Sequence, residues 1–267
     1  MIKLYVKAIW LIFKQKGHIY KKLPMNEEKK KLVVLANGPS LNVSLKNMKV
    51  NQEYDYMCVN LFPAKNELFE IIRPRFLCMI DPIFYDKDSP KREDVILLEK
   101  KLDKVDWDMY VICYWKQRIE TNNEHIHYLF INYNYYLGRV NRSAFWLFEH
   151  NFACIEYKNV AVACIFAGIQ MHYPVIEVYG IDSNAYLNVS VNNRNEMIVK
   201  ETHFYGEKIY NYSDLYPSVR NGGMEYLFRN QMELMQAFGL LNEYAKHNAI
   251  KVLNKTPNSY VDVFERE

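Results

Sequence analysis

The chain has 267 residues, of which half are apolar and about a quarter are charged, and its formal net charge is +3. This composition is typical of a globular protein with one large domain or two small ones, and it excludes a disordered chain. A net charge this small gives no indication of nucleic-acid binding. The five cysteines stand singly, so the sequence predicts buried reduced thiols without disulfides, and the seven scattered histidines show no metal-ligand spacing.

The first 24 residues combine several lysines with Trp10 and the apolar run 11–13. Their longest uncharged run, 8–13, is far shorter than the roughly 20 residues that cross a membrane. No small-residue cleavage site follows, which argues against a signal peptide. The pattern favours a basic amphipathic helix lying on an anionic membrane surface, and the alternative is a helix packed on the domain.

Short apolar runs bounded by turns or charges predict strands at 31–36, 54–59, 74–80, 107–115, 174–182 and 250–254. Helices are expected between several of them, at 89–102, 159–173 and 224–247. The second of these helices is apolar almost all round, which indicates burial, and Asn159 is its candidate N-cap. Strands that alternate with helices predict an α/β fold with a doubly wound, mostly parallel sheet and ligands at the carboxyl ends of its strands.

Two stretches do not fit this alternation. Residues 120–143 are polar and rich in tyrosine, and residues 183–223 form a long excursion rich in asparagine and tyrosine. Long excursions of this kind are uncommon in compact domains and are often functional. Because the second one begins directly after a predicted strand, on the expected ligand side, we expect it to be a lid.

Small and polar residues follow four of the predicted strands. The first strand runs into "ANGPS", where Gly38 permits close backbone approach and Ser40 is expected to cap a helix whose N-terminus favours an anion. A plain Asn-Gly turn is the simpler interpretation of this loop taken alone. More polar groups than turns require gather at this edge of the predicted sheet, and the candidate ligand-binding residues are Asn37, Gly38, Ser40, Asn60, Asp81, Gly180 and Asp182.

The predicted lid holds one histidine, His203 in "THFYG". A lone histidine is usually structural, but one that faces a ligand site is a reasonable general base at neutral pH. Tyrosines of the same segment are candidate donors to a leaving phosphate. No Walker loop, no Asp-x-Asp at a strand end and no Gly-x-Ser-x-Gly are present, which leaves a metal-free reaction on a nucleotide-bearing substrate.

Four ordered segments, "VVLANGPSL", "NVAVACIFAGIQMHYPVIEVYGID", "THFYG" and "TPNS", resemble the bacterial lipooligosaccharide sialyltransferase family over about residues 31–265. The resemblance implies a single Rossmann-like domain, 31–267, with a lid at about 183–223. It also implies inverting transfer of sialic acid from CMP-sialic acid to a terminal sugar of a lipid-linked surface glycan, without metal or other cofactor. The enzyme would then be cytoplasmic, attached to the inner face of the cell membrane through residues 1–24, and a homo-oligomer is an open alternative to a monomer.

The resemblance also implies roles for single residues. His203 is the general base, and Tyr186 is the best candidate to donate a hydrogen bond to the leaving phosphate. The remaining positions implied to bind the CMP-sugar are Asn37, Gly38, Ser40, Asn60, Asp81, Asn159, Gly180, Asp182, Pro257, Asn258 and Ser259.

The sequence departs from the family where the sialic acid should lie. Asp81 stands where the family has Asn, Leu61 stands where it has Gln, and "YKNVA" at 157–161 replaces Arg-Ile-Thr-Ser-Gly, leaving Lys158 or Asn159 as substitutes. Two alternatives therefore stay open: a glycosyltransferase that uses another CMP- or UDP-sugar, and a non-catalytic protein that binds nucleotide sugars.

Overall fold

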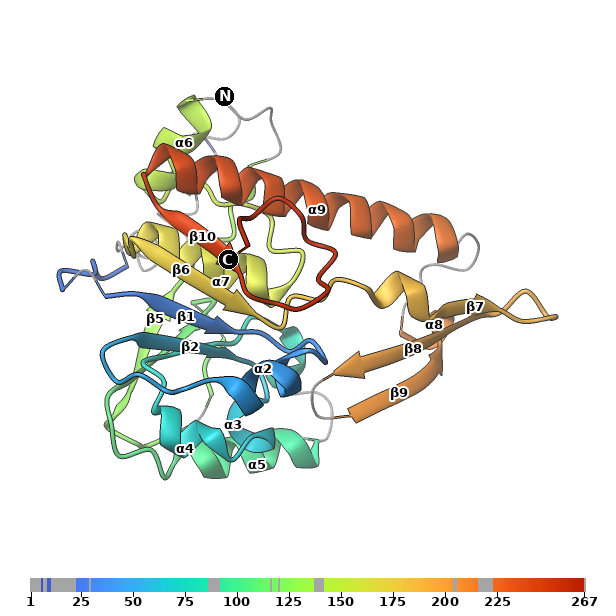
Figure 1. Ribbon diagram of the computed structural model, residues 1–267, viewed down its shortest axis with the longest axis horizontal. Helices are drawn as coiled ribbons and strands as arrows, with labels where there is room; N and C mark the ends of the chain where they lie inside the picture. Colours follow the sequence, from blue (N-terminus) through green and yellow to red (C-terminus); the bar gives the residue numbers. More distant parts are fainter. Residues whose placement is uncertain are drawn as a thin grey trace.

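The computed structural model describes Val6, Ile9, Trp10 and residues 23–28, 30–85, 92–115, 117–119, 121–136, 142–203, 206–215 and 223–266. The expected membrane-surface helix at 1–24 falls almost entirely outside the described residues, so it stays a prediction. The remaining chain forms a large central sheet, helices on its two faces, and a small second sheet set to one side (Figure 1).

The central sheet has seven strands in the order β10-β6-β1-β2-β3-β4-β5, and every pair in it is parallel. Its strands are β1 (Leu32–Leu35), β2 (Asp55–Val59), β3 (Phe76–Cys78), β4 (Met109–Cys113), β5 (Ile126–Phe130), β6 (Val175–Tyr179) and β10 (Lys251–Asn254). The chain builds outward from β1 through β2 to β5 and then returns to β6 on the other side of β1. This reversal is a topological switch point, where ligands of doubly wound proteins bind.

Helices cover both faces because the central strands are apolar on both faces. Along β1, Leu32 and Val34 belong to one hydrophobic core, and Val33 and Leu35 belong to the core on the opposite face. The first core contains α7 (Val160–Gln170) and α9 (Gly223–His247), together with α6 (Arg142–Glu149). The second core contains α2 (Leu41–Asn47), α3 (Phe62–Lys65), α4 (Leu68–Ile72) and α5 (Glu93–Leu102).

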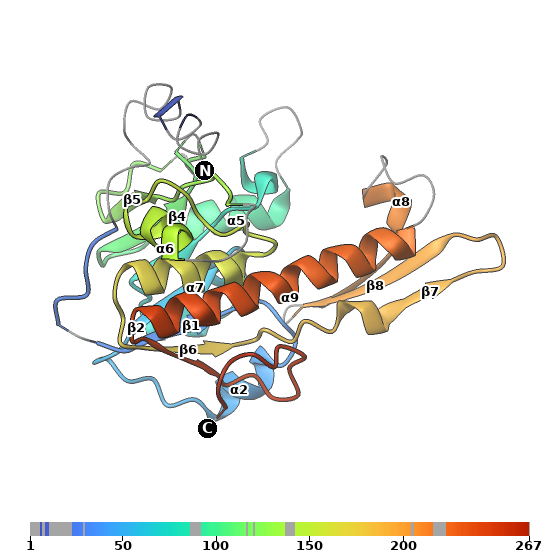
Figure 2. The same cartoon turned by 90° about the horizontal axis from the view of Figure 1, so that it is seen from above.

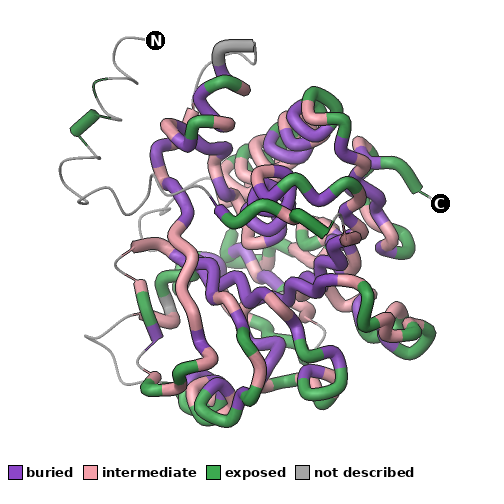
Figure 3. Tube along the Cα trace, turned by 90° about the vertical axis from the view of Figure 1, so that its left-hand side faces the viewer, coloured by how far each residue is buried: buried purple, intermediate pink, exposed green. Residues whose placement is uncertain are grey.

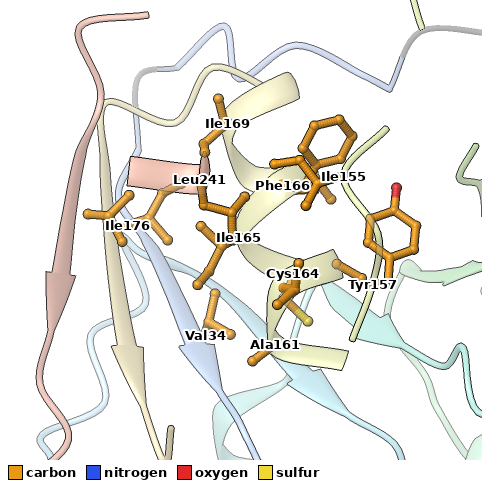
Figure 4. Packing of buried hydrophobic residues seen from close by; sticks show 14 of the residues in the cluster. Val34, Ile155, Tyr157, Ala161, Cys164, Ile165, Phe166, Ile169, Ile176 and Leu241 are labelled. Carbon is orange, nitrogen blue, oxygen red and sulfur yellow. The ribbon is translucent and has the colours of Figure 1, made fainter. Parts of the chain in front are cut away.

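The buried helix α7 lies flat on the sheet, as its sequence predicts. Ile165 and Ile169 point from α7 toward the strands, near Val34 and Ile176, while Phe166 packs on the other side beside Ile155 (Figure 4). Gly168 brings the helix close, since a Cβ there would come within 2.8 Å of Leu32 Cδ2. The tube coloured by burial shows the same layering, with buried segments inside and exposed residues on the outer turns (Figure 3).

Residues 183–223 are called the insertion here, and those of them that the structure describes form a separate small sheet with two short helices. Its elements are η3 (Ala185–Asn188), β7 (Val189–Val191), β8 (Met197–His203), β9 (Gly206–Asn211) and α8 (Tyr212–Leu215). The three strands pair antiparallel in the order β7-β8-β9. A small hydrophobic cluster centred on Met197, Val199 and Tyr212 joins them to Met224 and Leu227 at the start of α9. The insertion thus lies beside the far end of α9, beyond the carboxyl ends of β1 and β6 (Figures 1 and 2).

The predicted α/β fold with a doubly wound sheet is confirmed, and the sheet is more uniformly parallel than expected. The sequence analysis missed strand β5, which lies within the polar stretch 120–143, and helix α6, which begins at its end. It also missed helices α3 and α4 between β2 and β3, and η2 (Pro82–Phe84) after the third strand. Strand β5 lies at the edge of the sheet and four of its five residues are only half-buried, so it lacks the continuous apolar run of the inner strands. The sequence analysis assigned no secondary structure to the insertion, and its described residues are largely β-structure.

Helix α9 offers a direct test of this packing. Phe238 is fully buried against the sheet, whereas Phe228 on the same helix is 52% exposed. We expect Phe238→Ala to lower the free energy of unfolding by about 3–5 kcal/mol, because it leaves a cavity in the core. The matched change Phe228→Ala should stay within about 0.5 kcal/mol of the wild type. Chemical denaturation measures both, and equal losses would contradict the placement of α9.

Candidate functional site

A cavity of about 570 Å³ opens at the carboxyl ends of β1, β2, β3 and β6 and is closed on its other side by the insertion and α9. Residues that follow four parallel strands therefore meet in one place, as expected for a switch point. Eight of the predicted site residues line it: Asn37, Gly38, Asn60, Asp81, Asn159, Gly180, Asp182 and His203.

The loops that follow the neighbouring strands β1 and β6 contact each other at the cavity. The backbone N–H of Gly38 donates to the carbonyl of Gly180 at 2.9 Å. A Cβ at position 38 would lie 1.9 Å from Asp182 Oδ2 and 2.5 Å from Gly180 O, so only glycine fits there. Gly180 itself has a φ of +76°, a conformation in which glycine is unstrained. The close backbone approach expected at Gly38 is therefore found, but the group that approaches is the loop after β6.

Hydrogen bonds between Ser40 and Asp182 hold these two loops together. Asp182 is only 8% exposed, and it accepts hydrogen bonds from Ser40 Oγ at 2.7 Å and from Ser40 N at 3.2 Å. Burial raises the pKa of Asp182, and the two hydrogen bonds from Ser40 partly oppose that rise. The prediction that Ser40 caps the following helix is wrong, because its side chain makes no capping hydrogen bond to α2 and is directed to Asp182.

Two asparagines in the cavity wall have unused hydrogen-bonding capacity. Within the described residues, the buried Oδ1 atoms of Asn37 and Asn60 have no hydrogen-bond partner. Asn60 also has a φ of 50°, a left-handed conformation that asparagine adopts more readily than most residues. Buried polar atoms are normally paired, so these two oxygens are available to donor groups of a ligand or to water.

The first turn of α7 forms the adjacent wall. Asn159 is its N-cap, as predicted, and its side chain accepts from the N–H of Val162 at 3.0 Å. Val160 and Ala161, which follow it, line the cavity. Because the first turn of a helix leaves backbone N–H groups without intrahelical partners, this wall presents donors and a partial positive charge.

Lys158 lies just before α7 and connects it to α9. Its Nζ contacts Glu233 Oε2 at 2.5 Å and Glu156 Oε1 at 2.9 Å. Burial alone would lower the pKa of Lys158, but the hydrogen bonds to the two carboxylates outweigh it and raise the pKa. This lysine therefore lines the cavity as a charge that is already balanced by protein carboxylates.

His203 reaches the cavity from the insertion. It is the last residue of β8, which runs back toward the central sheet (Figure 1). It is half-buried beside Thr202, which also lines the cavity. The structure therefore brings His203 and Asn37 to one cavity, although 165 residues separate them along the chain. Phe204 and Tyr205, the next residues of the motif, lie outside the described residues.

Five predicted site residues do not line the cavity: Ser40, whose side chain is directed to Asp182, and Tyr186, Pro257, Asn258 and Ser259. The ring of Tyr186 packs edge-on against Tyr260, with 5.5 Å between centroids. Pro257 and Asn258 are exposed in the turn after β10. Ser259 Oγ donates to the carbonyl of Ile181 at 2.5 Å and accepts from the N–H of Val261. The "TPNS" segment thus supports the loop after β6 from behind.

The sequence analysis did not single out the three amide-bearing residues of the opposite wall. Asn184 directly precedes η3, Asn188 ends it, and Gln231 comes from α9; all three line the cavity. The nearest signal for the first two was the abundance of asparagine in the insertion. Nothing in the sequence distinguished Gln231 from other polar residues of α9, since its role depends on where the insertion folds back.

No group of three or more His, Cys, Asp or Glu side chains among the described residues is arranged to hold a metal ion. None of the helices described is both long enough and apolar enough to cross a membrane.

The sequence matches no protein-family model and no curated protein. Among solved structures, the sialyltransferase CstII from Campylobacter jejuni, in complex with the substrate analogue CMP-3FNeuAc, is similar to this chain. The two share 14% sequence identity, and the match covers 89% of this chain and 85% of that one with a TM-score of 0.43. A likeness at this level assigns neither a family nor a function to this chain.

The Ser40–Asp182 contact can be tested by deletion of the hydroxyl. Ser40→Ala leaves a buried carboxylate with one hydrogen bond fewer, so we expect the free energy of unfolding at pH 7 to fall by about 1–3 kcal/mol. The loss belongs to the charged form, because Ser40 donates to the carboxylate. It should therefore shrink as the pH falls and Asp182 is protonated in the variant.

The control for this prediction is Ser44→Ala, one turn further along α2, where the hydroxyl donates only to the carbonyl of Ser40. It should change the free energy of unfolding little at either pH. Denaturant titrations at pH 7 and pH 4 measure both variants. A loss in Ser40→Ala that is the same at the two pH values would contradict the assignment to Asp182.

Proposed function

We propose that this protein is a glycosyltransferase that binds a nucleotide-sugar donor in the cavity at the switch point. The observation that carries the proposal is the meeting, in one cavity, of Asn37 and Asn60 from the strand ends with His203 from the insertion. Asparagine side chains and the first turn of α7 supply neutral hydrogen-bonding groups for a nucleotide. A histidine on the opposite wall supplies a base for an acceptor hydroxyl.

In the proposed reaction, the bond between the anomeric carbon of the sugar and the nucleotide phosphate breaks, and the phosphate leaves with the electron pair. The acceptor oxygen forms the new bond from the opposite face of the sugar, which inverts the anomeric carbon. The hydroxyl proton passes to His203. The N–H groups at the start of α7 lie on the wall where hydrogen-bond donors would stabilise the negative charge that develops on the departing phosphate.

CMP-sialic acid is the donor that the sequence resemblance implies, and we propose it as the first donor to test, without a metal cofactor. One feature of the cavity favours a second candidate. Asp81, a carboxylate, lines the cavity, and the single lysine among its described lining residues, Lys158, already contacts two carboxylates. A donor whose sugar carries no carboxylate, linked to CMP or UDP, would avoid repulsion from Asp81. The acceptor on a lipid-linked glycan and attachment to the inner membrane face through residues 1–24 stay predictions from the sequence.

Nucleotide binding can be measured before the sugar is known. A ligand that binds only the folded state raises its stability by about 2.7 kcal/mol when present at 100 times its Kd. We expect CMP to raise the melting temperature more than UDP or GDP does. Asn37→Ala should reduce that rise without lowering the melting temperature of the free protein by more than a few degrees. If none of the three nucleotides shifts the melting temperature, the proposed donor class is wrong.

The role of His203 is tested by His203→Ala. Loss of a general base lowers rates by about 10²–10⁴-fold, so we expect transfer to fall by that factor while the CMP-induced thermal shift is retained. His247→Ala is the matched control. His247 is the last residue of α9, at the end away from the insertion, and it pairs with Glu149 of α6. This variant should keep the wild-type transfer rate. A transfer rate that is unchanged in His203→Ala would remove His203 as the base and favour the non-catalytic alternative.

A further inference from the structure

The two walls of the cavity differ in charge. The charged side chains that line it, Asp81, Lys158 and Asp182, all belong to the loops at the strand ends or to the segment before α7. The wall built by the insertion and α9, which we call the insertion wall, carries no Asp, Glu, Lys or Arg among the described lining residues. Its members are Ser183, Asn184, Ala185, Asn188, Thr202, His203, Gln231 and Leu234.

The insertion wall is rich in amide groups with free hydrogen-bonding capacity. Asn184 and Asn188 are half-buried, and within the described residues their side chains have no hydrogen-bond partner. Gln231 Nε2 donates to the carbonyl of Ser183 at 3.2 Å, which fixes the orientation of its side chain and leaves the amide oxygen available. A primary amide carries an acceptor oxygen and a donor NH2 group. This combination matches hydroxyl groups, which both donate and accept hydrogen bonds.

The position of His203 assigns this wall to one of the two substrates. A general base must lie within hydrogen-bond distance of the hydroxyl that it deprotonates. An acceptor next to His203 therefore also lies next to the side chains that share its wall, while the nucleotide occupies the opposite wall with Asn37 and Asn60. A carboxylate on the acceptor would find no cation on this wall among the described residues, and burying an unpaired charge is costly.

We propose that the insertion wall is the acceptor subsite and that it selects an uncharged terminal sugar, with Asn188 and Gln231 as its specificity-determining residues. This inference rests on the proposed function. Leu234, on the same face of α9 as Gln231, supplies an apolar surface for the sugar ring beside the amides. The two amides come from different elements, η3 and α9, so the subsite exists only while the insertion stays packed on the start of α9.

The first test uses the full-length protein and separates donor turnover from transfer. CMP-N-acetylneuraminic acid and a set of UDP-sugars are each supplied with water alone, with neutral glycosides of galactose, glucose and their N-acetylamino forms, and with the matching uronides. Transfer to at least one neutral glycoside, at a kcat/KM at least ten times that for its uronide, is expected. Equal transfer to the uronide, or donor hydrolysis with no transfer to any neutral glycoside, would overturn the proposal. Absence of both hydrolysis and transfer with every donor would instead refute the proposed function.

The second test examines the two residues. Asn188→Ala and Gln231→Ala are each expected to raise the KM for the acceptor by about tenfold, since each removes hydrogen bonds to a hydroxyl. The KM for the donor and the rate of donor hydrolysis should stay at the wild-type values. The matched control is Gln236→Ala on an exposed part of α9 that does not line the cavity, and it should change neither KM. Variants that raise the KM for the donor and leave the KM for the acceptor unchanged would overturn the assignment of the wall.

Discussion

The whole site depends on the contact between the loops that follow β1 and β6, at the switch point of the sheet. The N–H of Gly38 meets the carbonyl of Gly180, and the absence of a Cβ at residue 38 leaves room for the Asp182 carboxylate, which Ser40 then holds. The C-terminal segment adds further support, since Thr256 Oγ1 accepts from the N–H of Ile181 and the N–H of Tyr260 donates to the carbonyl of Asp182. These contacts fix the exits of β1 and β6, and with them the positions of Asn37 and of the first residues of the insertion.

This arrangement separates residues that build the site from residues that are free to bind. Gly38, Ser40, Asp182 and Ser259 have their polar groups engaged with one another or with backbone. Asn37 and Asn60 retain buried oxygens with no partner within the described residues. Polar residues next to each other in a loop can therefore serve different purposes, and only the partner of each side chain distinguishes them.

The sequence alone predicted the architecture and the convergence of polar strand-end residues at one edge of the sheet. Inner strands such as 32–35 are continuous apolar runs, and consecutive parallel strands end at the same edge, so their terminal residues had to converge. Strand β5 escaped prediction because an edge strand has neither the alternation nor the continuous apolar run of an inner strand. The place of Gln231 in the cavity depends on contacts between distant parts of the chain. Strands β7, β8 and β9, by contrast, pair as consecutive hairpins that the sequence analysis did not recognise. Ser40 was assigned as a cap from its local position alone, but a buried carboxylate 142 residues away takes its hydroxyl.

Helix α9 is one continuous helix of 25 residues that joins the core on one face of the central sheet to the small hydrophobic cluster of the insertion. Phe238 and Leu241 are buried in the main core, Met224 and Leu227 pack on the insertion, and Gln231 lies between them at the cavity. Each residue advances a helix by about 100° and about 1.5 Å. An insertion or deletion of one residue between Leu234 and Phe238 would therefore rotate the outer half of the helix, carrying Gln231 away from the cavity while the core stayed packed. Homologous chains that keep this cavity are thus expected to vary in length at the tip of the β7–β8 hairpin and not within this part of α9, because even a whole added turn would shift Gln231 by about 5.4 Å along the axis.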